Sequence, residues 1–333
     1  DDVALRESAR QAKEAWERYL AQPKEHIAPQ LALAGLIATG LATDSSVAET
    51  AARSVPEVES LAQRTPWTIE PYTGLGAWVD VYDWTMEFTN GLPAVGPDQI
   101  DDMADAGVQT VFLQLGHDKA ATDELEADRF AALVDRAHER GLRVVGWYLP
   151  MLVDPVKDLR RILVGRDLRL DGLAIDIEAR TVADVAVRSQ RLLELSADLR
   201  AAVGDQAIGA ITPSAVHLQV VNTDFWPDFP WTALAATYDV LLPMTYWSLR
   251  LGDLHAGERY VGENIDRIRA STGQEDPPIH PIGGIADGIT VPDLEGMVRA
   301  IEVRGAIGGS LYDWRTSTPA QWKTLGPLRR PPP

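Results

Sequence analysis

The chain has 333 residues, 45% of them apolar, no cysteine, and 49 acidic against 31 basic residues, which gives a formal net charge of −18. This apolar content is ample for a sizeable core, in one large domain or two ordinary ones. The negative charge disfavours nucleic acid and anionic membrane surfaces as partners, and the lack of cysteine excludes disulfides, thiol catalysis and zinc–thiolate sites.

The first 70 residues have a helical pattern. Apolar side chains fall close to helical spacing up to Pro23, where that run ends, and a second helix is expected over 29–42. The polar, proline-containing stretch 43–71 is typical of a linker with one short helix over 46–54. We therefore predict an N-terminal helical extension and linker over residues 1–70.

The apolar segment 31–42 resembles the core of a signal peptide. It is too short to cross a bilayer of roughly 30 Å, and the region before it is long and mixed in charge. A buried helix is our prediction, with a targeting or membrane-contact segment as the alternative. The chain begins at Asp1, which suggests a processed or truncated chain, and we expect a secreted or cell-envelope protein although no signal segment is visible.

After Tyr72 the sequence alternates short β-rich runs with helical ones. The expected strands are 75–82, 109–115, 142–149, 172–178, 207–212, 239–247, 279–285 and 307–314. Repetition at roughly 30-residue intervals over about 255 residues matches a (β/α)8 TIM barrel, which we place at 71–328. A doubly wound open sheet is the alternative, but no strand is followed by a GxGxxG turn.

The helices between these strands have recognisable ends. Gly141, Gly204 and Gly305 each follow a helical run, as expected for glycine stop signals. Thr318 and Pro319 open the last helix as its cap and first residue. The final residues, 329–333, are predicted to be a disordered tail.

The segment DGLAIDIEAR (171–180) ends the fourth expected strand with two acids. Strand alternation points Leu173, Ile175 and Ile177 to one face and Gly172, Ala174, Asp176 and Glu178 to the other. The small residues leave room beneath the two carboxylates, which then occupy the mouth of the barrel, where reactive groups of this fold lie. Each acid raises the pKa of the other, so that Glu178 stays protonated as a general acid; the alternative is a pair of strand-capping acids that bind Arg180.

The motif resembles that of family 18 glycoside hydrolases, D-x-x-D-x-D-x-E on strand four. Asp171, Asp176 and Glu178 match it, and Ala174 stands where the family has its middle acid; the related family 85 has a similar DGWLINIE. Met244 and Tyr246 in PMTYW resemble the family's MxYD, with Trp247 replacing the acid, and GGSLYDW resembles GGxxxW, with Trp314 one residue later. Asp171 and Met244 are therefore expected to contact the substrate.

The resemblance implies a substrate-assisted retaining mechanism, an exception to the usual two-carboxylate scheme. Glu178 would protonate the glycosidic oxygen while the 2-acetamido carbonyl of the sugar attacks the anomeric carbon. Asp176 would orient the acetamide, and Tyr246 would hydrogen-bond the same group. Alternation independently puts Leu242, Met244 and Tyr246 on the inward face of the sixth strand.

Tryptophans supply further candidate sugar contacts. Of the ten in the chain, Trp78, Trp84, Trp147, Trp247 and Trp314 fall on or just after expected strands, and flat apolar rings suit sugar faces. Trp84, Trp247 and Trp314, at strand ends, are predicted to line the cleft, with Trp147 as a further contact. The alternative is packing in the core.

Other strand ends also carry acids. Asp80, Asp83, Asp118 and Asp313 would supply a base or nucleophile in an ordinary two-carboxylate reaction, and Asp80 and Asp313 are candidate substrate contacts. His117 beside Asp118 resembles an acid–base or metal pair, but no HxH or HExxH spacing is present, so we expect no metal and no cofactor.

We therefore expect a glycosidase, a hydrolase of O-glycosyl bonds, acting in polysaccharide degradation on a β-linked glycan that contains N-acetylhexosamine. Two alternatives stay open. One is a non-catalytic glycan-binding barrel, and the other is a glycosidase of another barrel family that uses an acid pair such as Asp176 and Asp80.

Overall fold

The computed structural model describes residues 67–330. The helices and the apolar segment expected within 1–66 lie outside this part of the chain, as do residues 331–333, and the domain boundary near residue 70 stays a prediction. Among the described residues, no helix has both the length and the apolar character needed to cross a membrane.

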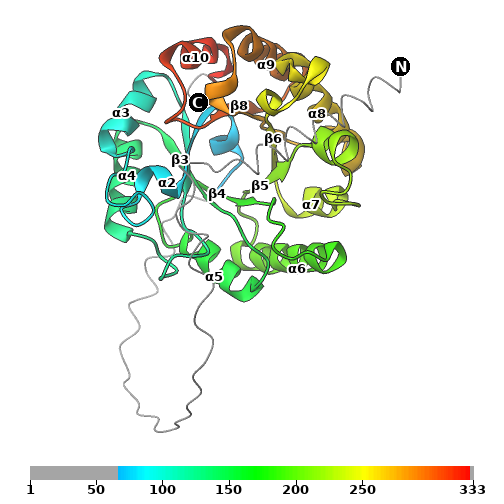
Figure 1. The fold of residues 1–333 in the computed structure, drawn as a ribbon. Helices are drawn as coiled ribbons and strands as arrows, with labels where there is room; N and C mark the ends of the chain where they lie inside the picture. The colour runs from blue at the N-terminus through cyan, green and yellow to red at the C-terminus, as the bar shows by residue number, and fades with distance from the viewer. Residues whose placement is uncertain (1–66, 331–333) are drawn as a thin grey trace.

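Eight parallel strands close into a barrel in sequence order, β1 to β8, with β8 pairing back to β1 (Figure 1). Their bounds are β1 Gly74–Val79, β2 Thr110–Gln114, β3 Arg143–Tyr148, β4 Gly172–Asp176, β5 Ile208–Pro213, β6 Val240–Thr245, β7 Ile282–Gly284 and β8 Gly308–Tyr312. Each overlaps an expected strand, so the (β/α)8 prediction is confirmed. The doubly wound alternative is wrong, because the sheet has no open edge.

Helices surround the strands (Figure 1). The α-helices are α2 Val81–Trp84, α3 Pro97–Asp105, α4 Ala127–Glu139, α5 Pro155–Val164, α6 Val185–Val203, α7 Trp231–Thr237, α8 Gly257–Thr272, α9 Val291–Arg304 and α10 Pro319–Thr324. Short turns are η2 Glu70–Tyr72, η4 Trp247–Leu249, η5 Gly252–His255, η6 Ala286–Gly288 and η7 Gly326–Leu328, and η3 His217–Val221 is a π-helix.

The expected helix ends are present. Gly204 and Gly305 follow α6 and α9 directly with φ of 64° at each, and Gly141, also at positive φ, lies two residues beyond α4. Thr318 caps α10 by accepting a hydrogen bond from Gln321, with Pro319 as the first helical residue. These caps fix where each helix begins or ends relative to its neighbouring strand.

Buried side chains form two apolar layers. The outer layer, between barrel and helices, includes Leu173, Ile175 and Ile177. The inner layer fills the barrel and includes the following side chains: Tyr72, Trp78, Phe112, Val145, Trp147, Ala174, Ile211, Val240, Leu242, Met244 and Ile282, with Tyr246 and Tyr312 packed against it. The alternation predicted for β4 and β6 is thus confirmed.

Tyr72 fills the amino-terminal end of the barrel. Its hydroxyl donates to the Leu173 carbonyl at 2.7 Å and accepts from the Leu173 N–H at 3.0 Å. A Cβ on Gly172 would lie 2.8 Å from this hydroxyl, and one on Gly209 would lie 2.9 Å from the ring. The ring of Tyr72 therefore takes part of the space that we expected beneath Asp176. A residue larger than glycine at position 172 or 209 would clash with this ring.

The start of the predicted C-terminal tail is bonded to the same end. The N–H of Arg330 donates to the Gln109 side-chain oxygen at 2.8 Å, and the Gln109 amide donates back to the Arg330 carbonyl at 2.8 Å. Arg329 donates to the Ala106 carbonyl at 2.6 Å. The prediction of disorder is therefore wrong for Arg329 and Arg330, because their polar groups have partners on the barrel.

Tyr72→Phe tests the contribution of the Tyr72 hydroxyl at the amino-terminal end of the barrel. Loss of the hydroxyl leaves buried backbone groups of Leu173 without this partner, so we expect the free energy of unfolding to fall by roughly 1–3 kcal/mol. Chemical denaturation measures it, with Tyr82→Phe, at a side chain 38% exposed, as the matched control. An equal effect of the two substitutions would contradict the role of Tyr72.

Candidate active site at the carboxyl ends of the strands

Two acids lie at the carboxyl end of β4, as predicted. Asp176 is the last residue of the strand and its side chain is 7% exposed, whereas Glu178, two residues later, is exposed. The Asp176 Oδ1 receives no hydrogen bond from the described residues. Burial, and then the negative charge of Glu178, raise the pKa of Asp176 well above its ordinary range. The expected effect of Glu178 on Asp176 is therefore present, with burial as the larger cause.

Aromatic rings lie beneath this pair. Trp147 on β3 is in register with Ala174, the inward residue before Asp176, and packs edge-on against Trp78 at 5.8 Å between ring centroids. Trp78 stacks on Phe112 at 4.4 Å. This packed apolar interior accounts for the desolvation of Asp176.

A second set of polar side chains lies at the same end of the barrel, contributed by β8 and by the residues that follow β1 and β6. The Tyr312 hydroxyl donates to the Asp80 Oδ2 at 2.8 Å, and the Tyr246 ring lies 5.9 Å from the Tyr312 ring. Gly284 allows this approach, since a Cβ there would lie 3.1 Å from the Tyr246 ring. Asp80 and Tyr246, both predicted for the site, therefore share the mouth with Tyr312, which sequence analysis missed.

Asp80, Asp83 and Asp313 form a carboxylate cluster, each with an oxygen within 4.8 Å of the others. Asp83 is fully buried and Asp313 is 5% exposed. Arg315 lies with its Nε 2.7 Å from the Asp83 Oδ1, an ion pair without hydrogen-bond geometry. Burial, and then the charges of Asp80 and Asp313, raise the pKa of Asp83 to about 8, although Arg315 opposes the shift.

This cluster is the only group of three such side chains with metal-ligand spacing in residues 67–330. Most of its oxygens are already used: Asp80 Oδ1 accepts from Tyr82 N–H at 2.7 Å, and Asp313 Oδ1 accepts from the N–H and hydroxyl of Thr316, each at 2.8 Å. Arg315 is the cation that offsets part of the negative charge of the cluster. Sequence analysis identified each of these acids as a strand-end residue but did not predict that the three side chains form one cluster.

Asp171 does not lie in the site. It precedes β4 at the amino-terminal end of the barrel, where its Oδ2 accepts from Val144 N–H at 2.7 Å and is 2.9 Å from His138 Nε2. The prediction that Asp171 contacts substrate is wrong in this structure, because the length of β4 separates it from Asp176. Its carboxylate holds the start of β3 and the end of α4.

Two of the predicted cleft tryptophans are also misplaced. Trp84 and Trp247 are both 0% exposed and belong to the outer apolar layer. The Trp84 indole N–H donates to the Gln114 carbonyl at 3.0 Å, and the Trp247 ring lies against Gly257 and Gly283. Neither ring presents a face to a ligand, so their assignment to the cleft is wrong.

The other predicted substrate contacts are half-buried or belong to the inner apolar layer. Trp314 is half-buried, with its ring 5.1 Å from that of Trp322. Trp147 and Met244 are inner-layer residues, 5% and 9% exposed. They form the floor of the mouth, beneath Asp176 and Tyr246, and remain candidates for contact with a deeply inserted group.

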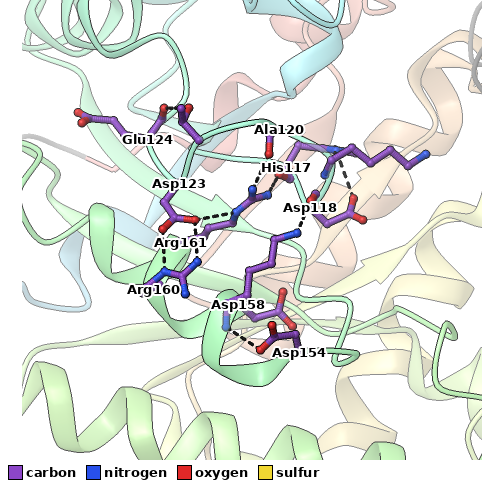
Figure 2. A network of polar contacts seen from close by, with 12 residues as sticks. His117, Asp118, Ala120, Asp123, Glu124, Asp154, Asp158, Arg160 and Arg161 are labelled. Carbon is purple, nitrogen blue, oxygen red and sulfur yellow. Dashed lines mark hydrogen bonds and ion pairs between the residues drawn. The ribbon is translucent and has the colours of Figure 1, made fainter. Parts of the chain in front are cut away.

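The His117–Asp118 pair belongs to a network between the β2 and β3 loops (Figure 2). His117 Nδ1 lies 3.2 Å from Asp118 and accepts from the Lys119 N–H at 3.1 Å. Arg161 donates to the carbonyls of His117 and Ala120. The network orders these loops around the guanidinium of Arg161, and burial lowers the pKa of His117.

Tyr312 and Arg315 are the site residues that sequence reasoning missed. Tyr312 follows Ser310 on β8 at inward spacing, and the Ser310 hydroxyl accepts from the Trp78 indole at 2.8 Å. Alternation applied to β8 would have placed Tyr312 at the mouth. Nothing in the spacing of Arg315 indicates its pairing with Asp83, because they belong to opposite ends of the chain.

Two surface hollows of about 390 and 400 Å³ lie at the amino-terminal end of the barrel. The first is lined by residues such as Arg200 and Asp239, and the second by residues such as Gln109 and Arg143. Neither contains the acids described above. We locate the candidate site by its chemistry at the carboxyl ends, as is general for this fold.

The closed sheet and the helices around it define a (β/α)8 barrel. Neither a family model nor a curated protein matches the sequence. Among solved structures, the chain is similar to the spore cortex-lytic enzyme SleL of Bacillus cereus, with 8% identity over 78% of this chain and 74% of that chain and a TM-score of 0.57.

Two other similar structures are a chitinase from Chromobacterium violaceum, with 12% identity over 78% of this chain and 100% of that chain and a TM-score of 0.51, and the endo-1,4-β-D-mannanase of Thermotoga petrophila, with 10% identity over 72% and 88% and a TM-score of 0.51. At these identities the likeness establishes the fold.

Asp83→Asn tests the carboxylate cluster. The pKa of Asp83 rises from 3.8 to about 8 on folding, so between these values the unfolded chain binds fewer protons, and stability falls as pH rises. The substitution removes this titration. We expect the thermal midpoint of the parent to fall by several degrees more than that of the variant between pH 5 and pH 8.

Circular dichroism melting at the two pH values measures this difference. Asp198→Asn, at an exposed position of α6, is the matched control and should follow the parent. Identical pH dependence in Asp83→Asn and the parent would contradict the raised pKa of Asp83.

Proposed function

We propose that this protein is a glycoside hydrolase that cleaves a β-linked glycan containing N-acetylhexosamine. The observation that carries the proposal is the exposed Glu178 beside the buried Asp176, whose pKa is raised, at the carboxyl end of β4. A carboxyl group open to a ligand and a second one held by the interior can take different roles in one reaction. The structural similarity to glycan-cleaving enzymes supports the class.

In the proposed reaction Glu178 is the general acid/base. Its proton passes to the glycosidic oxygen as the bond from that oxygen to the anomeric carbon breaks, and the 2-acetamido carbonyl oxygen of the same sugar bonds to that carbon. Water then adds to the carbon, its proton returns to Glu178, and the acetamide is released with the configuration retained. These roles follow the resemblance of β4 to family 18, an exception to the two-carboxylate scheme.

Asp176 and Tyr246 position the acetamide. The Asp176 carboxyl accepts the acetamide N–H, and in its ionised form it stabilises the positive charge of the cyclic intermediate. Tyr246 reaches the mouth from β6 and supplies a hydroxyl. Tyr312 and Asp80 form the opposite wall, with Asp313 behind them and Trp314 at its edge. A secreted or cell-envelope location would suit such an enzyme and is part of the proposal.

Glu178→Gln tests this function. The amide cannot donate a proton to the leaving oxygen, and general acid–base catalysis contributes roughly 100- to 10,000-fold, so we expect kcat/KM to fall by at least about 100-fold. Release of reducing ends from chitooligosaccharide, peptidoglycan and N-glycan panels, with products identified by mass spectrometry, measures it. Glu302→Gln, exposed on α9, should retain full activity.

Full activity of Glu178→Gln would remove Glu178 from the mechanism. Glycan binding without turnover by the parent protein, unchanged in Glu178→Gln, would instead identify a non-catalytic glycan-binding barrel.

The contact between Tyr312 and Asp80 favours a second candidate, an ordinary carboxylate pair. Asp80 lies at the mouth with a raised pKa caused first by burial, and the Tyr312 hydroxyl orients it. The inner face of β4 offers only Ala174 below Asp176, where family 18 has an acid. In this candidate Asp80 and Asp176 are the two carboxylates, and no acetamide is needed.

Asp80→Asn distinguishes the two candidates. If Asp80 acts as nucleophile or base, the variant loses at least about 100-fold in kcat/KM on a substrate without a 2-acetamido group, such as mannohexaose or cellohexaose, which the parent must cleave. No cleavage of these substrates by the parent, together with cleavage of chitohexaose, would eliminate the carboxylate pair.

A further inference from the structure

Three arginines lie on the rim beyond β4, β5 and β6. Arg180 follows Glu178, Arg188 is in the first turn of α6, and Arg250 follows η4. Within residues 67–330, none of the three forms an ion pair with a carboxylate, as Arg136 and Arg200 do. Some other arginines, such as Arg129 and Arg191, also lack an ion pair among the described residues and donate to carbonyls instead. What distinguishes these three is that they lie in one region of a chain whose net charge is −18.

Arg250 is buried, with only 5% of its surface exposed, and hydrogen bonds hold its guanidinium in place. Its Nε donates to the Tyr260 hydroxyl at 2.8 Å, and that hydroxyl lies 2.6 Å from the Ser214 hydroxyl. Ser214 Oγ accepts from the His217 N–H at 2.9 Å. These neutral groups orient the guanidinium and leave its positive charge in place.

Arg180 reaches the same region from β4. Its guanidinium carbon lies 4.9 Å from the centroid of the Phe225 ring, and the His217 ring lies 5.0 Å from that ring. Arg188, 2% exposed, lies 4.2 Å from the centroid of the Trp226 ring and donates to the Phe225 carbonyl at 2.9 Å. Phe225 therefore connects two of the arginines: Arg180 and His217 contact its ring, and Arg188 contacts its backbone. Arg250 is linked to the same residues indirectly, through Tyr260, Ser214 and His217.

The local field is positive. Burial, and then the charges of Arg250 and Arg180, lower the pKa of His217 to about 3, so its ring is neutral and adds no charge. Burial and the charge of Arg180 also lower the pKa of Arg188. Aromatic faces and carbonyls offset part of the cost of such burial, but a carboxylate is the partner that a guanidinium fork fits best.

We propose that this rim binds a carboxylate carried by the glycan, so that the substrate is an acidic polysaccharide. Its chemistry is a sugar-linked carboxylate, supplied by a uronic acid or by the lactyl ether of a muramic acid. Arg180 and Arg250 are the binding residues and Arg188 supports them. The proposal rests on the proposed function for its placement: Arg180 is two residues from Glu178, about 7 Å along an extended chain, which corresponds to a sugar next to the cleaved bond.

Binding is measured separately from turnover. The probes are a hyaluronan hexasaccharide, a tetrasaccharide of alternating N-acetylglucosamine and N-acetylmuramic acid, and neutral chitohexaose. Calorimetry in a Glu178→Gln background keeps them intact. We expect at least one acidic probe to bind about tenfold or more tightly than chitohexaose, as one charge-assisted hydrogen-bonded pair allows, and its affinity to fall with added salt.

Arg180→Gln and Arg250→Gln, each in this background, should lose about tenfold in affinity for the acidic probe and leave chitohexaose binding unchanged. Arg299→Gln, on α9 and paired with Glu258, is the matched control and should change neither. Arg250→Lys keeps the buried charge and should retain part of the preference, while Arg180, being exposed, can be replaced without disturbing the core. The acidic probe that binds identifies the source of the carboxylate.

The outcomes separate this proposal from the proposed function. Equal affinity for acidic and neutral probes, no binding of any probe, or equal loss of both in Arg180→Gln would overturn the carboxylate site, and cleavage of chitohexaose by the parent would then still support the hydrolase. A preference lost in the arginine variants, without turnover of any probe by the parent, would support the carboxylate site and overturn the hydrolase.

Discussion

Trp78 stacks on Phe112 inside the barrel at 4.4 Å, and the electrostatics of the mouth depend on this packing. The two rings, with Trp147 against them, fill the space below the strand ends with apolar atoms. Carboxyl groups placed above them cannot be fully hydrated, so their protonated forms are favoured. The same packing therefore raises the pKa of Asp176 on β4 and helps to bury Asp80 beyond β1.

The strands were predictable from sequence because they are short apolar runs, most of them next to a glycine or a capped helix, and eight such units match the (β/α)8 arrangement. The β4 acids were predictable for a related reason: alternation fixes which side chains point inward once the outward face is apolar. By the same argument Trp247 should point outward, since Tyr246 points inward, and the outer layer contains it. Trp84 was unpredictable by alternation because α2 begins at Val81 and ends the strand pattern.

Contacts between distant parts of the chain were not predictable. Tyr72 fills the barrel from a turn before β1, and its fit depends on Gly172 and Gly209 on two other strands. Arg315 reaches Asp83 across the junction of β8 and β1. Neither pairing leaves a periodic signal, because it depends on the closure of the sheet and not on local sequence.

Ala174 has a structural explanation in the register of the barrel. It lies opposite Trp147 on β3, and a Cβ on Gly209 of β5 would lie 3.4 Å from the Ala174 methyl group. A carboxylate at this position would be enclosed by apolar atoms with no cation nearby in the inner layer, at a cost of several kcal/mol. The aromatic floor therefore disfavours a middle acid, and Asp176 is the only acid within β4.

The mouth is asymmetric in charge, and this asymmetry bears on how a glycan would lie in it. Beyond β8 and β1 lie three carboxyl groups with one arginine, and beyond β4 to β6 lie three arginines. At physiological salt such fields persist for about 8 Å. In the proposed function, an acidic sugar would be repelled by the first side and attracted by the second, and this would fix one direction for the glycan across Glu178. A neutral glycan has no such preference, and its direction must come from the hydroxyls of Tyr246 and Tyr312.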